Sequence, residues 1–557
     1  MLDLLFTLFF LLAPVAASAQ IGILENRVAS GDVTQTTAVL WARSSTTGKH
    51  VFWYRAVSVP RSSWRSRAVE VADAEVPAKL LLRNLIPGSV YLYAFQNPDG
   101  NFDLGAFETP HLPGSRHGLR FGVTGDSRGD LAPYPAVRNA SGRGLDFFVF
   151  LGDTVYADAP SPALPAPQAR SLEEFRAKHE EVLTARLGLN ALADLRSLTA
   201  SFAVIDDHEV TNDFAGGAPP SSDSRFASEP GSYINETPFY QAGLQAFHDF
   251  HPIAERFHGA TGDPRTAGKR DLYRVRLYGS DAAVFLLDAR SFRDKPLPAV
   301  DDPLDPESIA DYLVASFDPS RTLLGRAQLD RLKAHLLAVE AAGITWKFVL
   351  VPEPVQNLGP LGASDRFEGY AAERTELLDF LRVNGIDNVV FVTADFHGTL
   401  VNDLFYQRQP FGEQFPVNAF EIVTGPIAYD PPFGPSLVNR AVSAGLIDEE
   451  LRAFYESLSM PLKDLFVELA IDFGLGFYGY NGLGLSGSTV NATLLTGSYV
   501  ATHVFGWTEL AVDAATQKLT VTVYGVAPYT RTDIETHPSA VLARSPTVVS
   551  RFVVTPR

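Results

Sequence analysis

The sequence predicts a mixed α/β protein in which an N-terminal β-sandwich precedes a larger domain of alternating strands and helices. Short apolar segments separated by turn residues occupy residues 26–110, and a strand–helix–strand order begins after residue 117. The chain has 557 residues, which is more than one ordinary domain, and 46% of them are hydrophobic. This composition is sufficient for a sizeable core.

The first 20 residues have the pattern of an export signal. Residues 4–15 are an almost unbroken apolar run, and Ala17-Ser18-Ala19 supplies small residues for a cleavage site. We therefore predict a signal peptide over residues 1–19 and an exported protein, either periplasmic or extracellular. A membrane anchor is the alternative, but the run is short for a span of ~18 or more residues, so we expect no transmembrane span after cleavage.

Residues 25–112 are predicted to form a β-sandwich of the fibronectin or immunoglobulin kind, because about seven short strands fit into this stretch. Turn clusters such as 87–89 and 98–100 separate the strands. No chemical constellation is visible here, so a packing or lid role is predicted. The clearest strands are residues 38–42, 51–54, 78–82 and 90–95.

Residues 117–557 are predicted to form the second domain, with a Phe/Tyr/Gly-rich and partly helical insertion at about 428–500. Amphipathic spacing predicts helices over 172–189, 325–338 and 371–383. A hairpin of 507–512 with 519–524 and a strand at 548–554 close the chain. The other strands are expected at 119–124, 145–151, 200–205, 272–278, 283–287, 346–350, 389–393 and 420–423.

Four of these strands run directly into acidic and polar side chains. Functional groups gather at the carboxyl ends of strands in α/β sheets, so these side chains are expected to share one small volume. Carboxylates that crowd together need compensation, and multivalent cations supply it while also binding phosphoryl oxygens. An isolated aspartate at a strand end is usually a turn former, so the signal is the ordered set. The four segments begin at Asp126, Asp153, Asp206 and Asp395.

Charge and cysteine content exclude several classes of function. The formal net charge of −18 argues against nucleic-acid binding, which needs clustered Lys and Arg. The same charge would repel a phosphate substrate unless bound cations reverse the local field. The chain has no cysteine, so disulfides, cysteine zinc sites and thiol nucleophiles are excluded.

Three motifs resemble a known family. They are Gly-Asp-Thr-Val-Tyr-Ala-Asp at 152–158, Asp-Asp-His-Glu-Val-Thr-Asn-Asp at 206–213 and Ala-Asp-Phe-His at 394–397. They look like the alkaline phosphatase D (PhoD-like) branch of the calcineurin-like metallophosphoesterases, and the resemblance covers nearly the whole chain outside the insertion. It implies a calcineurin-like metallophosphoesterase β-sandwich flanked by helices. It also implies a secreted hydrolase in which metal-bound hydroxide attacks phosphate monoesters, diesters or both.

The resemblance also implies roles for individual residues. Asp153 would bridge two metals, and Tyr156 would be a phenolate ligand of a ferric ion. His208 would contact the phosphate and protonate the leaving alkoxide. Asp207 matches a ligand position, with the neighbouring Asp206 as an open alternative. The remaining ligands implied by the motifs are Asn212, Asp395 and His397.

The first motif departs from the family pattern. Many members have a cysteine ligand after the first strand, where this chain has Asp126, and Arg128 stands where the wider superfamily has a histidine. Arg128 cannot bind a metal, so we expect it to grip a phosphoryl oxygen. Hard oxygen ligands favour hard cations. We therefore expect two or more metal ions, calcium or iron, with manganese, magnesium and zinc as alternatives.

Two other functions compete with this one. The flexible, aromatic segment 473–485 suits a phospholipase D-like phosphodiesterase acting on phospholipids, so the substrate is either a small phosphate ester or a phospholipid. The residue Arg128 and the absence of a clear superfamily histidine after residues 346–352 fit a degenerate, non-catalytic binding protein. The sequence makes no prediction of the oligomeric state.

Overall fold

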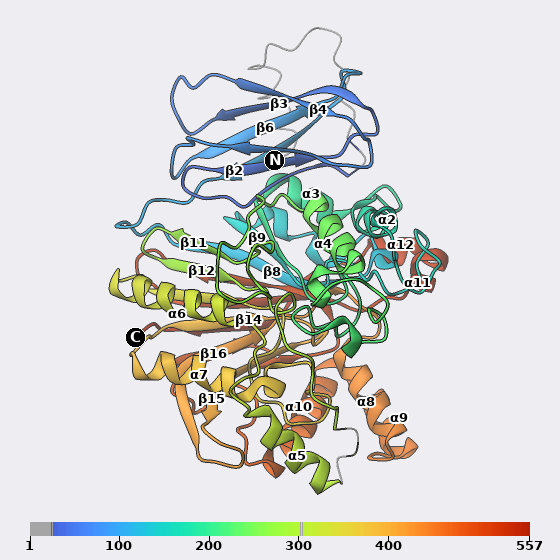
Figure 1. Cartoon of the computed structure of the whole chain (residues 1–557), viewed down its shortest axis with the longest axis vertical. Coiled ribbons are helices and arrows are strands. Elements are labelled where there is room, and N and C mark those ends of the chain that lie inside the picture. The colour runs from blue at the N-terminus through green and yellow to red at the C-terminus, as the bar shows by residue number, and fades with distance from the viewer. Residues whose placement is uncertain (1–23, 25, 301, 303–304) are drawn as a thin grey trace.

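The computed structural model describes residues 24, 26–300, 302 and 305–557. The predicted signal peptide, residues 1–19, lies outside the described residues. Figure 1 shows the N-terminal strands stacked on a larger body of two sheets with helices outside them. Within the described ranges, none of the helices combines the length and apolarity that crossing a bilayer requires.

Seven strands occupy the N-terminal region, as the alternation predicted. Four of them form a separate antiparallel sheet in the order β4-β3-β6-β7, and the others pair as β1-β2-β5. Strand β1 also pairs in parallel with β10 (Ser201–Val204) of the second domain. The strands are β1 (Val28–Gly31), β2 (Ala38–Ala42), β3 (Gly48–Ala56), β4 (Arg65–Val71), β5 (Ala78–Leu82), β6 (Val90–Gln96) and β7 (Phe102–Glu108).

The contact between β1 and β10 requires a glycine. A Cβ atom on Gly31 would stand 2.3 Å from the backbone oxygen of Ser201, closer than real Cβ contacts come. Through this pairing the β1-β2-β5 sheet continues into the large sheet of the second domain. The N-terminal sandwich is therefore bonded to the sheet that carries the candidate site.

The second domain is built on two sheets that share a core. One runs β18-β22-β21-β20-β8-β9-β10 before it reaches β1, and the other runs β11-β12-β13-β14-β16-β15-β19. The rings of Phe121 and Phe348, one from each sheet, meet edge to face at 5.0 Å. Strands β9, β13 and β14 are buried along their whole length, as expected for parallel strands covered on both faces. The strands that position the site are β8 (Leu119–Ser127), β9 (Phe147–Leu151), β13 (Trp346–Leu350) and β14 (Val389–Thr393).

The rest of the two sheets completes this framework. The C-terminal hairpin predicted from the sequence is present, with β20 and β21 antiparallel. The strands are β11 (Arg274–Tyr278), β12 (Ala282–Leu286), β15 (Thr399–Gln407), β16 (Gln414–Val423), β17 (Pro426–Ala428), β18 (Ala492–Thr496), β19 (Val500–Ala501), β20 (Phe505–Val512), β21 (Leu519–Val526) and β22 (Thr547–Val554).

Helices cover the outer faces of the sheets. The predicted helix over 172–189 is wrong at its C-terminal end, because α2 (Leu172–Leu183) stops early. Leu187 and Gly188 adopt left-handed backbone angles there, and a new helix, α3 (Ala191–Leu198), starts at an Asn190 cap. The other helices are α4 (Pro238–Phe250), α5 (Pro306–Ser316), α6 (Arg326–Ala341), α7 (Ala371–Val383), α11 (Arg531–Thr536) and α12 (Pro538–Leu542).

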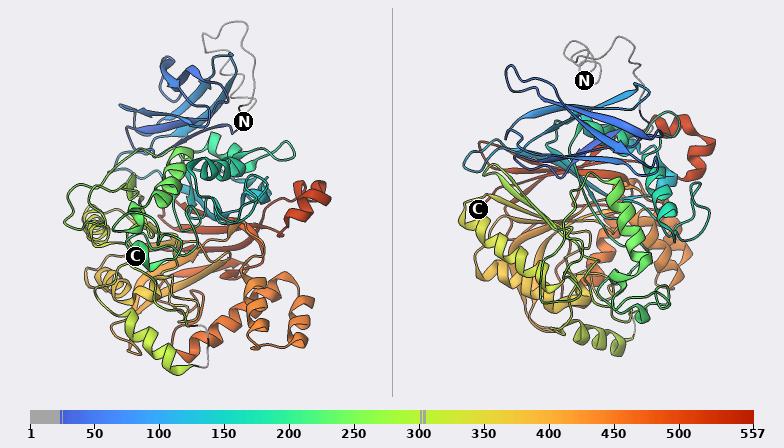
Figure 2. Two further views of the ribbon diagram at one scale, coloured as in Figure 1. Left: turned by 45° about the vertical axis from the view of Figure 1, so that its right-hand side comes forward. Right: turned by 45° about the horizontal axis from the view of Figure 1, so that its top comes forward.

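The insertion predicted at about 428–500 is mostly helical. It contains α8 (Phe433–Ser443), α9 (Glu449–Ser457) and α10 (Met460–Phe477). Figure 2 shows these three helices, in orange, at the end of the molecule away from the blue N-terminal strands. The prediction of a mixed α/β fold with a β-sandwich at its N-terminus is confirmed.

Candidate metal centre

The candidate site lies where strands of the two sheets end. Asp126 is the penultimate residue of β8, Asp153 follows β9, Asp207 follows β10 and His397 follows β14. Asp126, Asp153 and His397 all have positive φ, at 56°, 48° and 53°. A non-glycine residue held there costs about 1 kcal/mol or more, and such residues concentrate at functional sites. The fold therefore bends each loop so that its side chain turns toward one point.

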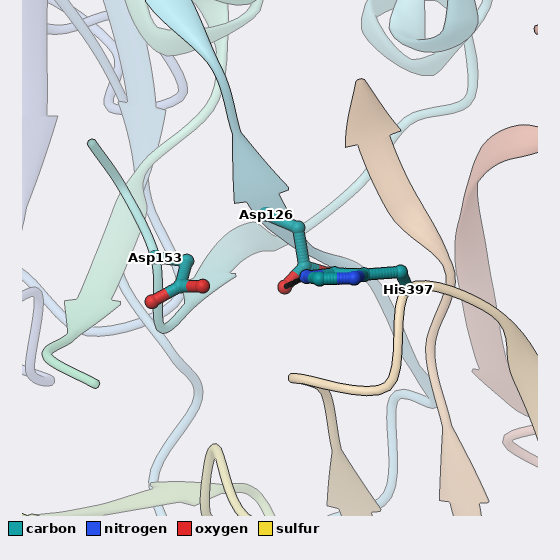
Figure 3. A group of neighbouring side chains, drawn as sticks. All are labelled: Asp126, Asp153 and His397. Carbon is teal, nitrogen blue, oxygen red and sulfur yellow. Dashed lines mark ion pairs between the residues drawn. The ribbon is translucent and has the colours of Figure 1, made fainter. Parts of the chain in front are cut away.

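Two overlapping groups of possible metal ligands result. Asp126, Asp153 and His397 form one group, and Asp153, Asp207 and His208 form the other, each with its ligand atoms within 4.8 Å of one another. Figure 3 shows Asp126 and His397 facing each other with Asp153 beside them, each on a different segment. Asp153 belongs to both groups, so its position suits a residue that bridges two ions.

The carboxylates of this cluster are buried without partners. Both oxygens of Asp126, Oδ2 of Asp153 and Oδ1 of Asp207 have no hydrogen-bond partner among the described residues. Burial and then the charges of neighbouring carboxylates raise the pKa of Asp126 and of Asp153 well above the usual range. Buried polar atoms are normally satisfied. Multivalent cations would satisfy these oxygens and relieve the repulsion, so the residues present fit a metal centre.

Tyr156 and His397 complete the first group. The Tyr156 hydroxyl lies 3.2 Å from Nε2 of His397. Burial and then the charge of His208 lower the pKa of His397 to about 3, so its imidazole is neutral and keeps a lone pair for a ligand. The His397 ring also stacks on Tyr429 at 3.5 Å. Sequence reasoning missed Tyr429, which lies at the start of the insertion and outside the strand-end pattern.

His208 is held by an acid that the sequence analysis gave no role. Its Nδ1 donates to Asp158 at 2.6 Å, and its Nε2 lies 3.9 Å from Asp207 Oδ1 and 4.0 Å from Asp153 Oδ2. Burial lowers the pKa of His208, but the charge of Asp207 and the bond to Asp158 outweigh it and raise the pKa to about 10. The signal for Asp158 was available, because it ends the motif at 152–158.

The remaining predicted residues lie around this cluster. Asn212 is exposed, and its backbone N–H donates to Asp158 at 2.7 Å. Burial and then the charge of Glu353 raise the pKa of Asp395 well above its usual range, and Asp395 belongs to none of the groups of possible ligands among the described residues. Arg128 makes a two-point bond to Asp130 at 2.9 and 3.0 Å. This bond holds the guanidinium in one orientation.

Comparison with known proteins identifies the family. Residues 124–456 match the model of the family described as PhoD-like phosphatase. This chain belongs to the PhoD-like phosphatase family. Alkaline phosphatase D of Bacillus subtilis (strain 168) is 24% identical over 412 residues, which are 68% of this chain and 65% of that protein. The alignment thus spans about 65% of the relative's length.

One of the similar solved structures supports the fold of the whole chain. The structure titled PhoD is similar with a TM-score of 0.67 and 18% sequence identity, covering 97% of this chain and 91% of that one. A purple acid phosphatase from yellow lupin seeds covers 95% of this chain and 73% of its own, with a TM-score of 0.47 and 10% identity. The PhoD likeness supports the predicted architecture of the second domain.

In this member of the PhoD-like phosphatase family, Asp206 and Asp207 have different surroundings. The buried guanidinium of Arg290 bonds to Asp206 at 2.7 Å and also contacts Asp365 at 2.7 Å and Glu353 at 2.6 Å. Arg290 bonds to both oxygens of Asp206, at 2.7 and 3.2 Å, but it reaches only Oδ2 of Asp207, at 3.4 Å, and Oδ1 of Asp207 has no hydrogen-bond partner among the described residues. Asp207 is the better candidate ligand of the two.

A third group of possible ligands and a buried glutamate are found in the loops that carry the site. Asp207, Asp213 and Asp365 form the third group of possible ligands. Glu209 accepts hydrogen bonds from the N–H and hydroxyl of Thr154, both at 2.7 Å, and from the Asp206 N–H at 2.9 Å. It thereby joins the loop after β9 to the loop after β10, which fixes Asp153 relative to Asp207.

Proposed function

We propose that this protein is a metal-dependent hydrolase of phosphoesters. The observation that carries the proposal is the set of buried carboxylate oxygens on Asp126, Asp153 and Asp207 that lack partners and face two imidazoles. Membership of the PhoD-like phosphatase family supports the same chemistry. The acidic residues of the site would bind cations. The site also contains a protonated histidine and an arginine, and these positive charges suit an anionic ester.

The chain offers ligands for two ions that share Asp153. Asp126, Tyr156 and His397 would hold one ion together with Asp153, and Asp207 would hold the other. When bound, the metals neutralise charge on phosphoryl oxygens and make a water molecule nucleophilic near neutral pH. The ligand after the first strand of the domain is the carboxylate of Asp126 in this chain, so hard cations such as calcium or ferric iron are favoured.

The partly exposed side chains of the site would act on the substrate. His208 and Arg128 have side chains 17% and 25% exposed, whereas those of Asp126, Asp153 and Asp207 are at most 3% exposed. A substrate thus reaches the cations past the histidine and the arginine. Arg128, oriented by Asp130, would bind a phosphoryl oxygen. His208, protonated because its pKa is about 10, would give its Nε2 proton to the leaving alcohol.

The experiment that tests this proposal combines activity with elemental analysis. The full chain should hydrolyse p-nitrophenyl phosphate, its bis ester or both, and should contain two or more bound metal ions. The Asp153→Asn variant should lose most of both properties because the residue shared by the two groups is changed. Asp379→Asn is the matched control, since Asp379 is bonded to Tyr406 and Arg408 on the surface of α7, away from the strand ends. Undiminished turnover in Asp153→Asn would refute the assignment.

A further inference from the structure

Helix α10 has its apolar side turned outward. Every exposed residue of this helix is apolar or glycine, whereas its charged residues are buried or half-buried. Leu469 is 60% exposed, Phe473 72% and Phe477 75%. The spacing of four residues between them places them on one face of the helix. That stripe begins about two helical turns earlier. Its members are Leu462, Leu465, Leu469, Phe473 and Phe477.

Two acidic side chains of α10, those of Asp464 and Asp472, accept hydrogen bonds from the rest of the protein. Asp464 is buried, and it accepts from the Thr502 N–H at 2.7 Å and from His503 Nδ1 at 2.7 Å. Asp472 accepts from the N–H of Leu483 at 2.7 Å. A surface helix of a water-soluble domain normally does the reverse, with its apolar stripe toward the core. The outward face of α10 is therefore suited to an apolar medium.

The apolar surface extends beyond one helix. Phe473 and Phe477 meet edge to face at 5.0 Å, although both rings are mostly exposed. Isolated exposed apolar side chains are common, but a contiguous group of this kind marks an interaction site. The part of the insertion that leads into α10 adds further exposed apolar residues, namely Leu446, Leu451, Phe454 and Met460. We call these residues and the α10 stripe the α9–α10 face.

The charges around this face identify what covers it. The start of α9 exposes Asp448, Glu449 and Glu450; Glu449 pairs with Arg452, but the insertion at 428–500 still holds eight acidic residues against three basic ones. In a dimer formed through this face, the acidic residues of the two copies would repel each other. An anionic membrane would repel the same residues. A zwitterionic lipid surface has no net charge and offers apolar depth for Leu and Phe.

We propose that the α9–α10 face docks on a zwitterionic phospholipid surface. Helix α10 would lie in the plane of the interface with its stripe buried among the acyl chains, without crossing the bilayer. Its 18 residues do not meet the requirements for a span, in agreement with this orientation. The proposal goes beyond ester hydrolysis, because docking is measured without turnover.

The docking face is connected to the candidate metal centre. The N–H of Phe433, the first residue of α8, donates to the backbone oxygen of His397 at 2.9 Å. The Phe433 ring packs on Phe396 at 4.4 Å. The same region is joined to α10, because Thr502 accepts from the Gly434 N–H and donates its hydroxyl to Asp464. A docked molecule would hold the His397 loop close to the lipid headgroups.

Flotation of the full chain with phosphatidylcholine vesicles tests this proposal. The wild-type protein should float with the vesicles, and the double variant Leu469→Glu/Phe473→Glu should show at least a tenfold lower bound fraction. The matched control is Leu112→Glu/Val383→Glu, at positions 56% and 64% exposed elsewhere, and it should bind like wild type. Turnover of p-nitrophenyl phosphate by all three proteins, measured in parallel, shows separately that each is folded and that the proposed hydrolysis holds.

Four results would overturn the proposal. They are wild-type protein that stays with the aqueous fraction, equal losses in both double variants, stronger flotation with phosphatidylserine vesicles, and a dimer that the α10 variant dissociates without any lipid binding.

A variant that keeps the face apolar gives an independent measurement. The emission of Phe473→Trp should shift to the blue when phosphatidylcholine vesicles are added, whereas that of Val383→Trp should not. Equal shifts in both would also overturn it.

Discussion

The Nδ1 atom of His208 lies 2.6 Å from the carboxylate of Asp158, and Asp158 also accepts the N–H of Asn212 at 2.7 Å. These bonds hold the imidazole with Nε2 turned toward Asp153 and Asp207. An ionised carboxylate only accepts hydrogen bonds, so the proton on Nδ1 is fixed and Nε2 faces the site. The pair thus sets both the orientation and the protonation of His208.

The Asp158→Asn variant tests this pairing. Loss of the charge should lower the pKa of His208 from about 10 and leave the imidazole less well oriented. We expect kcat to fall about 100-fold, within the range of general acid–base catalysis. Activity should also decline at a lower pH on the alkaline side, since His208 loses its proton earlier. Metal content should stay at the wild-type level, and a loss like that of Asp153→Asn would instead make Asp158 a ligand.

Arg290 is predicted to stabilise the acidic cluster. It is fully buried and bonded to Asp206, Asp365 and Glu353. The Arg290→Met variant would leave these buried charges uncompensated, which costs about 3–5 kcal/mol of the free energy of unfolding. Urea unfolding measures this change. The control Arg452→Met removes an exposed pair with Glu456 and should change the free energy by less than about 0.5 kcal/mol.

Metal removal should reverse the effect of the Asp126→Asn substitution on the unfolding temperature. With metal present, Asp126→Asn should unfold at a lower temperature than wild type, because binding to the folded state is weakened; saturating metal contributes about 4 kcal/mol at 1,000 times its Kd. In chelator the order should invert, since the amide does not repel Asp153. Thermal melts of both proteins, with and without chelator, check this. The same order in both conditions would contradict a cation site at Asp126.

His179 is predicted to make the fold sensitive to acid. Burial and then the charge of Arg196 lower its pKa to about 3, from 6.5. The folded state therefore binds fewer protons than the unfolded state between these values. The stability that His179 contributes is present above pH 6.5 and falls by about 1.4 kcal/mol per pH unit below it.

The variant His179→Gln isolates this contribution. The difference in free energy of unfolding between wild type and variant should shrink by about 2 kcal/mol from pH 6.5 to pH 4.5. Urea unfolding at both pH values, in chelator so that metal release does not contribute, measures it. Parallel pH dependences in the two proteins would refute the assignment.

Local patterns predicted most elements but not their partners. Short apolar runs located β2, β5, β13 and β14 to the residue, and helical spacing located α7. Strand β15 was missed, although it is nine residues long and nearly all buried, because Asn402 and Asp403 interrupt its apolar run. The pairing of β1 with β10 was not predicted either, since pairing depends on residues that are distant in the chain.

The sequence by itself determined which side chains follow the buried strands of this protein. Acidic residues and histidines that follow buried strands indicate a site for hard cations, because those side chains must meet where the strands end. Only the tertiary structure distinguished Asp206 from Asp207. Arg290, 84 residues away from Asp206, bonds to both oxygens of Asp206, whereas it reaches only Oδ2 of Asp207, at 3.4 Å, and Oδ1 of Asp207 has no protein partner among the described residues. The charge state of a buried carboxylate depends on its neighbours in space, and the packing of two sheets selects those neighbours.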